Sequence, residues 1–155
     1  MSSTSSINEL LSEESNFISN AANFSAYIFN NYENLNWVGF YMLSGDDLLL
    51  SVFQGKPACL RISLGKGVCG YSAINKKPII VSDVNQFAGH IACDTASRSE
   101  IVIPIIKNDK LYGVLDIDSP IISRFNNADL EEFTNLLNIL IENSDLEKIY
   151  DYYNA

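Results

Sequence analysis

The order of apolar segments along the chain constrains the fold most strongly. Six short runs rich in β-branched and aromatic residues lie between residues 36 and 118, and a long amphipathic segment lies on either side of them. Short runs of this composition predict strands, whereas apolar residues at helical spacing predict helices. The sequence therefore predicts a sheet that is preceded and followed by helices.

Short turns at residues 44–47 and 107–110 join neighbouring strands, which favours a mostly antiparallel sheet. We expect an α+β fold of two or three layers, with the terminal helices on one face of the sheet. Asn126 or Asn127 could cap the last helix. The expected elements are a helix over 6–32, strands over 36–43, 48–55 and 59–64, a short helix over 65–75, a strand over 79–81, a loop over 83–98, strands over 100–106 and 111–118, and a helix over 126–150.

Length and charge narrow the class of protein. A chain of 155 residues predicts a single domain over 1–155. A net charge of −9 argues against binding to nucleic acid or to anionic membranes, because both attract basic surfaces. No apolar run reaches the ~18 residues that a membrane span needs. The first residues lack the features of a signal peptide, so we expect a cytoplasmic protein whose thiols are kept reduced.

Three cysteines, Cys59, Cys69 and Cys93, lie in the middle third of the chain. An odd number cannot form a fully paired disulfide framework within one chain. Cysteines gathered in this way fit thiol chemistry, a metal site, or simple burial, because free cysteine is among the most buried residue types. Cys93 lies in the predicted loop near His90, and loops on a rigid scaffold commonly carry catalytic groups.

Two pairs of side chains share a face of the predicted sheet. Asp116 and Asp118 are two residues apart in one strand, and Trp37 and Tyr41 are four apart in another. Neighbouring carboxylates are costly unless they bind a ligand or one is protonated. The alternatives are a solvated strand face for the aspartates and ordinary core packing for the aromatic pair.

Two motifs suggest other functions and are weak. Residues 65–70 read GKGVCG, which matches a dinucleotide-binding fingerprint, but only a short helix follows and no long parallel βαβ unit surrounds it. We expect these glycines to form a tight turn. Cys59, Cys69, His90 and Cys93 could together bind zinc, yet no CxxC pair supports such a site. We therefore expect no metal and no organic cofactor.

The element order, the NWVGFY and LYGVLDIDSP strands and the GKGVCGYSA segment resemble those of GAF domains. More narrowly, the chain resembles the free methionine-(R)-sulfoxide reductases, the enzymatic branch of that fold. The specific features are three cysteines spaced by ten and then twenty-four residues, HIACD around the last, Glu100 in SRSEIVIPI, and both aspartates of LDID. The resemblance covers nearly the whole chain and implies a GAF-like fold.

The resemblance also implies roles for individual residues. Cys93 would attack the substrate, and Cys59, with Cys69 as the alternative, would resolve the sulfenic acid into a disulfide. Glu100, Asp116 and Asp118 would line the pocket, with Glu100 and Asp118 in acid–base work and Asp116 anchoring the substrate. Trp37 would hold the methyl-sulfoxide end, and Tyr41 would hydrogen-bond the oxygen or a carboxylate.

The expected function is the reduction of free methionine-(R)-sulfoxide to methionine, with recycling by thioredoxin. Two alternatives are a non-catalytic GAF domain that senses a small molecule and a thiol-based oxidant sensor. The apolar faces of the terminal helices could support a homodimer, unless the sheet covers them fully.

Overall fold

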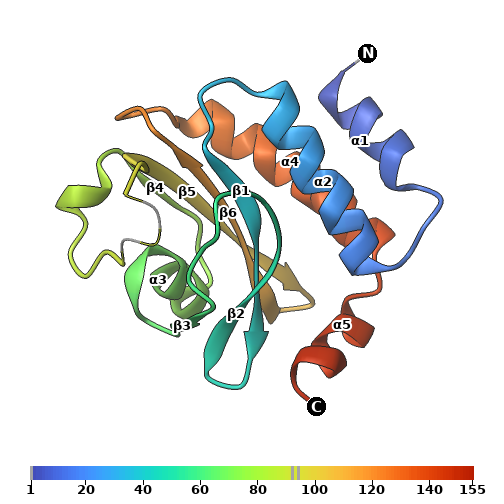
Figure 1. The fold of residues 1–155 in the computed structure, drawn as a ribbon. Coiled ribbons are helices and arrows are strands. Elements are labelled where there is room, and N and C mark those ends of the chain that lie inside the picture. The colour runs from blue at the N-terminus through green and yellow to red at the C-terminus, as the bar shows by residue number, and fades with distance from the viewer. Residues whose placement is uncertain (1, 92, 94) are drawn as a thin grey trace.

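A six-stranded sheet forms the centre of the protein (Figure 1). The structure is a computed structural model that describes residues 2–91, 93 and 95–155. The strands lie in the order β3-β2-β1-β6-β5-β4 and every neighbouring pair is antiparallel, which confirms the predicted sheet. They are β1 (Trp37–Ser44), β2 (Asp47–Gly55), β3 (Arg61–Ser63), β4 (Ile79–Val81), β5 (Ser99–Lys107) and β6 (Lys110–Ser119).

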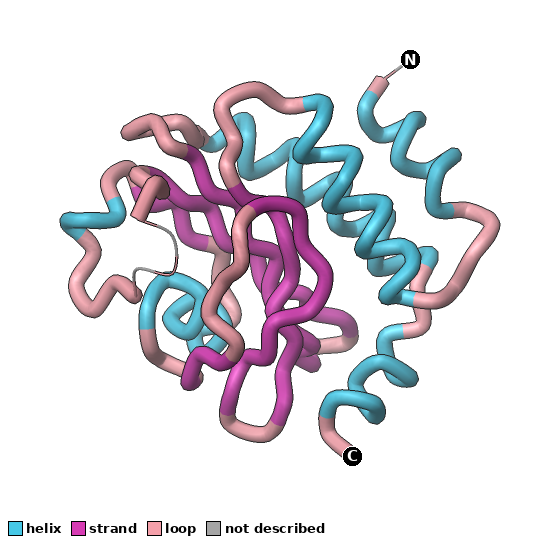
Figure 2. The backbone as a smooth tube through the Cα atoms, viewed as in Figure 1, coloured by secondary structure: helices cyan, strands magenta, loops and turns pink. Residues whose placement is uncertain are grey.

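Helices cover the two faces of the sheet unequally. The terminal helices α1 (Ser3–Leu11), α2 (Phe17–Asn31), α4 (Asn127–Asn143) and α5 (Leu146–Tyr153) lie on one side (Figure 1). Figure 2 shows that the other side carries α3 (Gly67–Asn75) and long loops, including the short 3-10 helix η1 (Val84–Gln86). Both ends of the chain lie on the side of the terminal helices. No helix of the described residues combines the length and apolar character that a membrane crossing requires.

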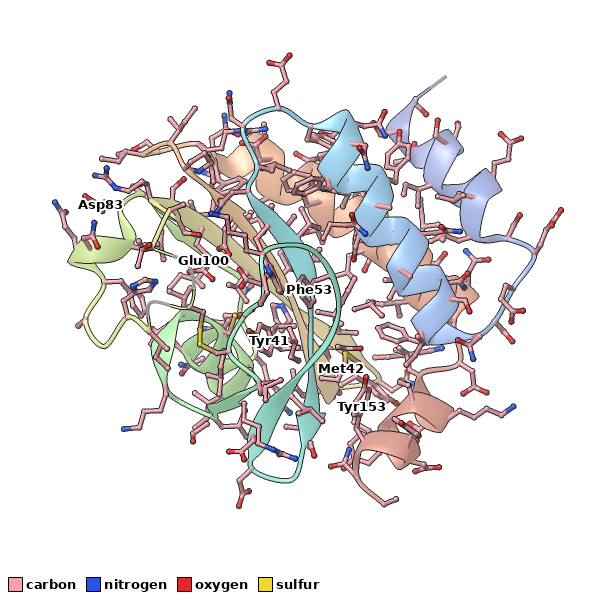
Figure 3. All side chains as sticks on the ribbon, in the orientation of Figure 1. Tyr41, Met42, Phe53, Asp83, Glu100 and Tyr153 are labelled. Atoms are coloured by element: carbon pink, nitrogen blue, oxygen red, sulfur yellow. A yellow bond between two sulfur atoms is a disulfide. The ribbon has the colours of Figure 1, made fainter. Side chains whose placement is uncertain are left out.

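Strand alternation separates two apolar clusters on opposite faces. In β1, Val38 and Phe40 pack with the terminal helices, whereas Trp37 and Tyr41 belong to the cluster beneath α3. Figure 3 shows the same alternation in Tyr41 and Met42, which point to opposite sides of β1. The face shared by Trp37 and Tyr41 is therefore as predicted, and it is the face that the loops cover.

The predicted helix over 6–32 is wrong in one respect, because it is two helices. The first helix ends at Leu11, the second begins at Phe17, and the residues between them are not helical. The side chain of Glu14 accepts the amides of Ser15 and Asn16, and the side chain of Asn16 accepts the amide of Ser19. These local bonds end one helix and cap the next, so they outweigh the continuous apolar periodicity.

The predicted helix over 126–150 is also two helices. It starts as expected after Asn126, which forms a capping box with Asp129. Ser144 is extended and ends α4, and Asp145 caps α5 by accepting the amide of Lys148. A one-residue change of direction therefore lets α5 turn back toward the β1–β2 hairpin, where Ser44 donates to the carbonyl of Tyr153 at 2.8 Å.

Candidate active site

Cys59 and Cys93 form a disulfide between the loop that follows β2 and the loop that precedes β5. Their Cα atoms are 5.4 Å apart, although 34 residues separate them in sequence. Of the two partners considered for Cys93, the structure pairs it with Cys59 and leaves Cys69 as a free thiol. Asp94, which follows Cys93 in the HIACD motif, lies outside the described residues.

Three acidic side chains lie side by side on the face of the sheet beneath α3. Strand register places Asp118 of β6 directly between Trp37 of β1 and Glu100 of β5. Asp116 lies one repeat further along β6, opposite Gly39. All three carboxyl groups are more than nine-tenths buried. The prediction that Asp116 and Asp118 share a face is confirmed, and Glu100 joins them by register rather than by sequence proximity.

Burial keeps two of these acids protonated. It raises the pKa of Glu100 and of Asp116 well above the usual range of a carboxyl, and the neighbouring carboxylates add to the effect. One oxygen of Asp116, Oδ1, has no hydrogen-bond partner among the described residues. A buried carboxyl with an unsatisfied oxygen indicates a group that a ligand completes.

Cys69 differs from the other two cysteines in its surroundings. It lies in the first turn of α3 with 4% of its surface exposed, and its thiol donates to Oε2 of Glu100 at 4.0 Å. A helix N-terminus alone would lower the pKa of a thiol, but burial and the adjacent acids raise the pKa of Cys69 well above that of a free thiol. Desolvation outweighs the helix dipole here, so this thiol stays protonated.

The aromatic pair forms one wall of the site. The rings of Trp37 and Tyr41 stack with centroids 5.9 Å apart, and Phe53 stacks on the other side of the indole at 5.1 Å. The indole lies over Gly39, where even a methyl group would collide with it and with Phe53. Its Nε1 donates to the carbonyl of Lys56 at 3.1 Å, which fixes the ring along the strand.

Tyr41 links this wall to the disulfide. Its hydroxyl donates to the backbone carbonyl of Cys59 at 2.8 Å, rather than to a carboxylate of the pocket. Burial and the nearby acids raise the pKa of Tyr41, so the hydroxyl keeps its proton and remains a donor. Tyr41 therefore connects the sheet to the loop that carries Cys59.

One cavity brings the predicted residues together. Seven of the eight line it, and Cys59 is bonded to one of those seven. Residues that sequence reasoning did not place there include Ser97, whose hydroxyl accepts from Asn36, and Ile62. Ser97 is the first residue of the SRSEIVIPI segment, which was the available signal for it, whereas Ile62 lies in no motif and reaches the cavity through strand β3. The predicted members are Trp37, Tyr41, Cys69, Cys93, Glu100, Asp116 and Asp118.

The glycine-rich segment also contributes to the cavity. Gly65 and Gly67 have positive φ angles of 84° and 62°, which supports the predicted tight turn. Gly67, Val68 and Cys69 open α3 at the cavity wall, and Lys66 gives the helix no side-chain cap. Amides at an uncapped helix start favour an anion. In the sequence, the glycine-rich turn before a short helix was the signal that could have indicated this anion-binding position.

The expectation of no metal can be compared with the donor atoms that the fold brings together. Cys59 and Cys93 are bonded to each other, so the zinc set with Cys69 and His90 does not assemble. Burial lowers the pKa of His90, which also lines the cavity. Ligand atoms of Cys69, Glu100 and Asp116 do lie within 4.8 Å of one another. Within this group the thiol of Cys69 donates to Glu100, and the raised pKa of Glu100 favours its protonated form, which is a poorer metal ligand than a carboxylate.

Fold and sequence together define the class of protein. The model of the GAF domain matches residues 24–140, which span the second half of α2, the whole sheet, α3 and most of α4. A Staphylococcus aureus structure described as fRMsr in its reduced form superposes with a TM-score of 0.88 at 45% identity, covering 90% of this chain and 91% of that one. The protein is a GAF domain.

Two relatives narrow the class further. The free methionine-R-sulfoxide reductase of Escherichia coli is 41% identical over 92% of this chain and 88% of its own. The Neisseria meningitidis structure of free methionine-R-sulfoxide reductase in complex with its substrate gives a TM-score of 0.87 at 36% identity, with 90% and 84% of the two chains covered. The chain belongs to the free methionine-R-sulfoxide reductase family.

Proposed function

We propose that the protein reduces free methionine-(R)-sulfoxide to methionine, with Cys93 as the attacking thiol and Cys59 as the resolving thiol. The observation that carries the proposal is the Cys59–Cys93 disulfide beside a cavity lined by buried acids. Disulfide formation is the expected end of a sulfoxide reduction by two thiols. Membership of the reductase family supports the same substrate.

The first step transfers oxygen from substrate to enzyme. The sulfur of Cys93 attacks the sulfoxide sulfur, and the sulfoxide oxygen is protonated. The hydroxyl group then passes to the sulfur of Cys93, while the sulfur–oxygen bond of the substrate and the transient bond between the two sulfurs break. Methionine leaves with two more electrons, and Cys93 becomes a sulfenic acid. Glu100 suits the role of proton donor, because burial raises the pKa of its carboxyl and so favours the protonated form. Asp118 lies directly beside it in the sheet and completes the acid–base pair that we propose.

The second step restores a stable oxidation state. The thiol of Cys59 attacks the sulfenic sulfur, a disulfide forms, and the oxygen leaves as water. Cys69 is less suited to this role, because its thiol is buried, protonated and bonded to Glu100. A dithiol protein such as thioredoxin then reduces the disulfide, and its own two thiols become oxidised.

Selectivity for the free amino acid would follow from two neighbouring groups in the cavity, because a carboxyl oxygen of Asp116 lies within 4.8 Å of the sulfur of Cys69 in the first turn of α3. An α-ammonium group would satisfy the unpartnered oxygen of Asp116 and would favour the ionised form of that acid. The amides at the start of α3 would receive the α-carboxylate. A methionine sulfoxide within a peptide has neither charge, so it would leave these buried groups unpaired. Trp37 would contact the methyl-sulfoxide end.

The test is an activity assay with both epimers. Purified protein is incubated with dithiothreitol and racemic free methionine sulfoxide, and the two epimers are quantified by chiral chromatography. We expect the R epimer alone to disappear and peptide-bound sulfoxide to remain. Persistence of both epimers, together with peroxide-driven formation of the disulfide, would instead favour the oxidant sensor.

Cysteine variants separate the two steps of the mechanism. Cys93→Ser should abolish turnover, because no sulfenic acid can form. Cys59→Ser should complete one turnover and then stop with thioredoxin as reductant, because the disulfide cannot close. Cys69→Ser should still turn over repeatedly with thioredoxin, because the Cys59–Cys93 pair is intact. Retained steady-state turnover in Cys93→Ser would exclude it as the nucleophile.

A further inference from the structure

Four large apolar side chains are exposed around the disulfide. Leu60 follows Cys59 directly and is 71% exposed, and Ile91, which lies two residues before Cys93, is 38% exposed. On α3, Ile74 and Tyr71 are 58% and 47% exposed. These side chains lie around one turn, because Ile91 packs against Gly67 and Ile74 against Gly65. Exposed apolar groups gathered around a reactive bond indicate an interaction surface.

The charge of the same region is opposite to that of the rest of the protein. Residues 48–82 contain five of the ten basic side chains and none of the 19 acidic ones. All five basic side chains are exposed. Only Arg61 among them forms an ion pair within the described chain, with Asp47. The five are Lys56, Arg61, Lys66, Lys76 and Lys77. Lys76 ends α3 and donates to the carbonyl of Asp109 in the far β5–β6 turn, next to Lys77 in sequence, so neither of these two belongs to the disulfide region. Lys56, Arg61 and Lys66, together with the four apolar residues, form what we call the docking surface.

The two cysteines of the disulfide differ in their position relative to the cavity. Cys93 lines the cavity, whereas Cys59 does not and is followed by the most exposed of the four apolar side chains. Attack from the docking surface would therefore reach Cys59 and release Cys93 toward the substrate site. This direction returns Cys93 to the cavity as a free thiolate.

We propose that the docking surface binds an acidic dithiol protein that reduces the Cys59–Cys93 disulfide, an inference that rests on the proposed function. One thiolate of the partner attacks the sulfur of Cys59, the disulfide breaks, and Cys93 leaves as a thiolate. The second thiol of the partner then attacks the mixed disulfide, releases Cys59, and leaves the partner oxidised by two electrons. A second copy of this chain is a poor occupant, because two basic surfaces would face each other.

The test measures reduction of the disulfide without any sulfoxide present. Protein oxidised with diamide is mixed with reduced thioredoxin of acidic pI, and the loss of disulfide is followed by rapid acid quench and mass spectrometry. We expect Lys66→Glu and Leu60→Ser each to lower the second-order rate constant about tenfold, because charge and apolar contact guide association. Added salt should slow the unchanged protein more than it slows Lys66→Glu.

Matched controls carry the same substitutions elsewhere. Lys107→Glu lies at the far end of β5, roughly 26 Å along the strand from Ser99. Leu10→Ser replaces an exposed leucine of α1, on the other side of the sheet. Both should react at the unchanged rate. Equal losses in Lys107→Glu and Lys66→Glu would reduce the effect to net charge and overturn the proposal, as would unchanged rates in both test variants.

Dithiothreitol separates docking from chemistry. This small neutral dithiol needs no docking surface, so we expect it to reduce all variants at the same rate. A slower reaction of Lys66→Glu with dithiothreitol would show a damaged disulfide site and contradict the proposal. A thioredoxin variant with a single cysteine should be trapped on Cys59, and trapping on Cys93 would overturn the direction of attack. Failure of sulfoxide turnover with dithiothreitol would instead count against the proposed function, and this assay would be unaffected.

Discussion

Two buried acids in the cavity lower the stability of the folded protein at neutral and higher pH. Glu100 and Asp116 are buried carboxyls whose pKa values are raised, so the folded state holds protons that the unfolded chain releases. A folded state that binds more protons loses stability as pH rises. The loss begins near pH 4.5, the ordinary pKa of a glutamate, and continues to the raised pKa of the folded state.

Replacing Glu100 tests this loss of stability. Glu100→Gln keeps the shape and removes the ionisable group, so thermal unfolding should occur at a higher temperature at pH 8 and depend less on pH above 4.5. The rate of R-sulfoxide reduction should fall by about a hundredfold or more, because the proton donor is lost. Calorimetry and the chiral assay measure the two effects. A variant less stable than the unchanged protein at pH 8 would contradict the burial argument.

Removing the hydroxyl of Tyr41 should slow the closure of the disulfide. Tyr41→Phe keeps the stacking on Trp37 but loses the hydrogen bond to the carbonyl of Cys59, whose worth of about 1 kcal/mol corresponds to roughly fivefold. The first release of methionine should keep its rate, while closure of the disulfide should slow and sulfenic acid should accumulate. Quenched-flow with a sulfenic-acid trap measures both. Tyr112→Phe, on the opposite face of the sheet, is the control and should change neither rate.

The partner of Cys93 in the disulfide could not be determined from the sequence alone. The sequence left Cys59 and Cys69 as alternatives, because spacing alone does not say which loop passes near Cys93. The structure decides it through the path of the chain after β2, which brings Cys59 within 5.4 Å of Cys93 between Cα atoms. Cys69 is instead committed to α3, where the sheet and the acids bury it.

Among the elements, strands were easier to predict than the ends of helices. Runs of β-branched and aromatic residues joined by short turns identified β1, β2, β5 and β6, because such residues favour strands over several consecutive positions. The predicted strand over 59–64 shortens to Arg61–Ser63, because Cys59 is committed to the disulfide. Both long helices were predicted without their breaks, because caps such as Asn16 and Asp145 act over three residues and leave the apolar period intact.

Strand β1 depends on one residue without a side chain. Gly39→Ala would place a methyl group into the indole of Trp37 and into Phe53, so we expect a loss of about 1–3 kcal/mol in the free energy of unfolding. Substrate affinity should fall as well, because the indole must leave the cavity wall. Urea unfolding and the KM for free sulfoxide measure these effects. Gly45→Asn, at an open turn with a φ of 60° that asparagine tolerates, should cost less than about 1 kcal/mol.

At the scale of the whole molecule, the cycle that we propose alternates between a chain with the Cys59–Cys93 bond and a chain without it. The disulfide closes a loop of 34 residues that includes α3 and β4, so the oxidised chain has fewer unfolded conformations. Loop-closure entropy predicts that oxidation raises the free energy of unfolding by about 3–4 kcal/mol at most. Urea unfolding of diamide-treated and dithiothreitol-treated protein measures the difference. In Cys59→Ser the two treatments should give the same midpoint, and a difference there would point to another cause.

The position of the chain ends matters for how the protein can be used. Both ends lie on the side of the terminal helices, whereas the cavity and the docking surface lie across the sheet (Figure 1). A linker, an affinity handle or a fluorescent reporter fused at either end would therefore project away from substrate and reductant. The same geometry allows attachment to an electrode or bead through the helices, with the cysteine pair facing the solution as a readable redox contact.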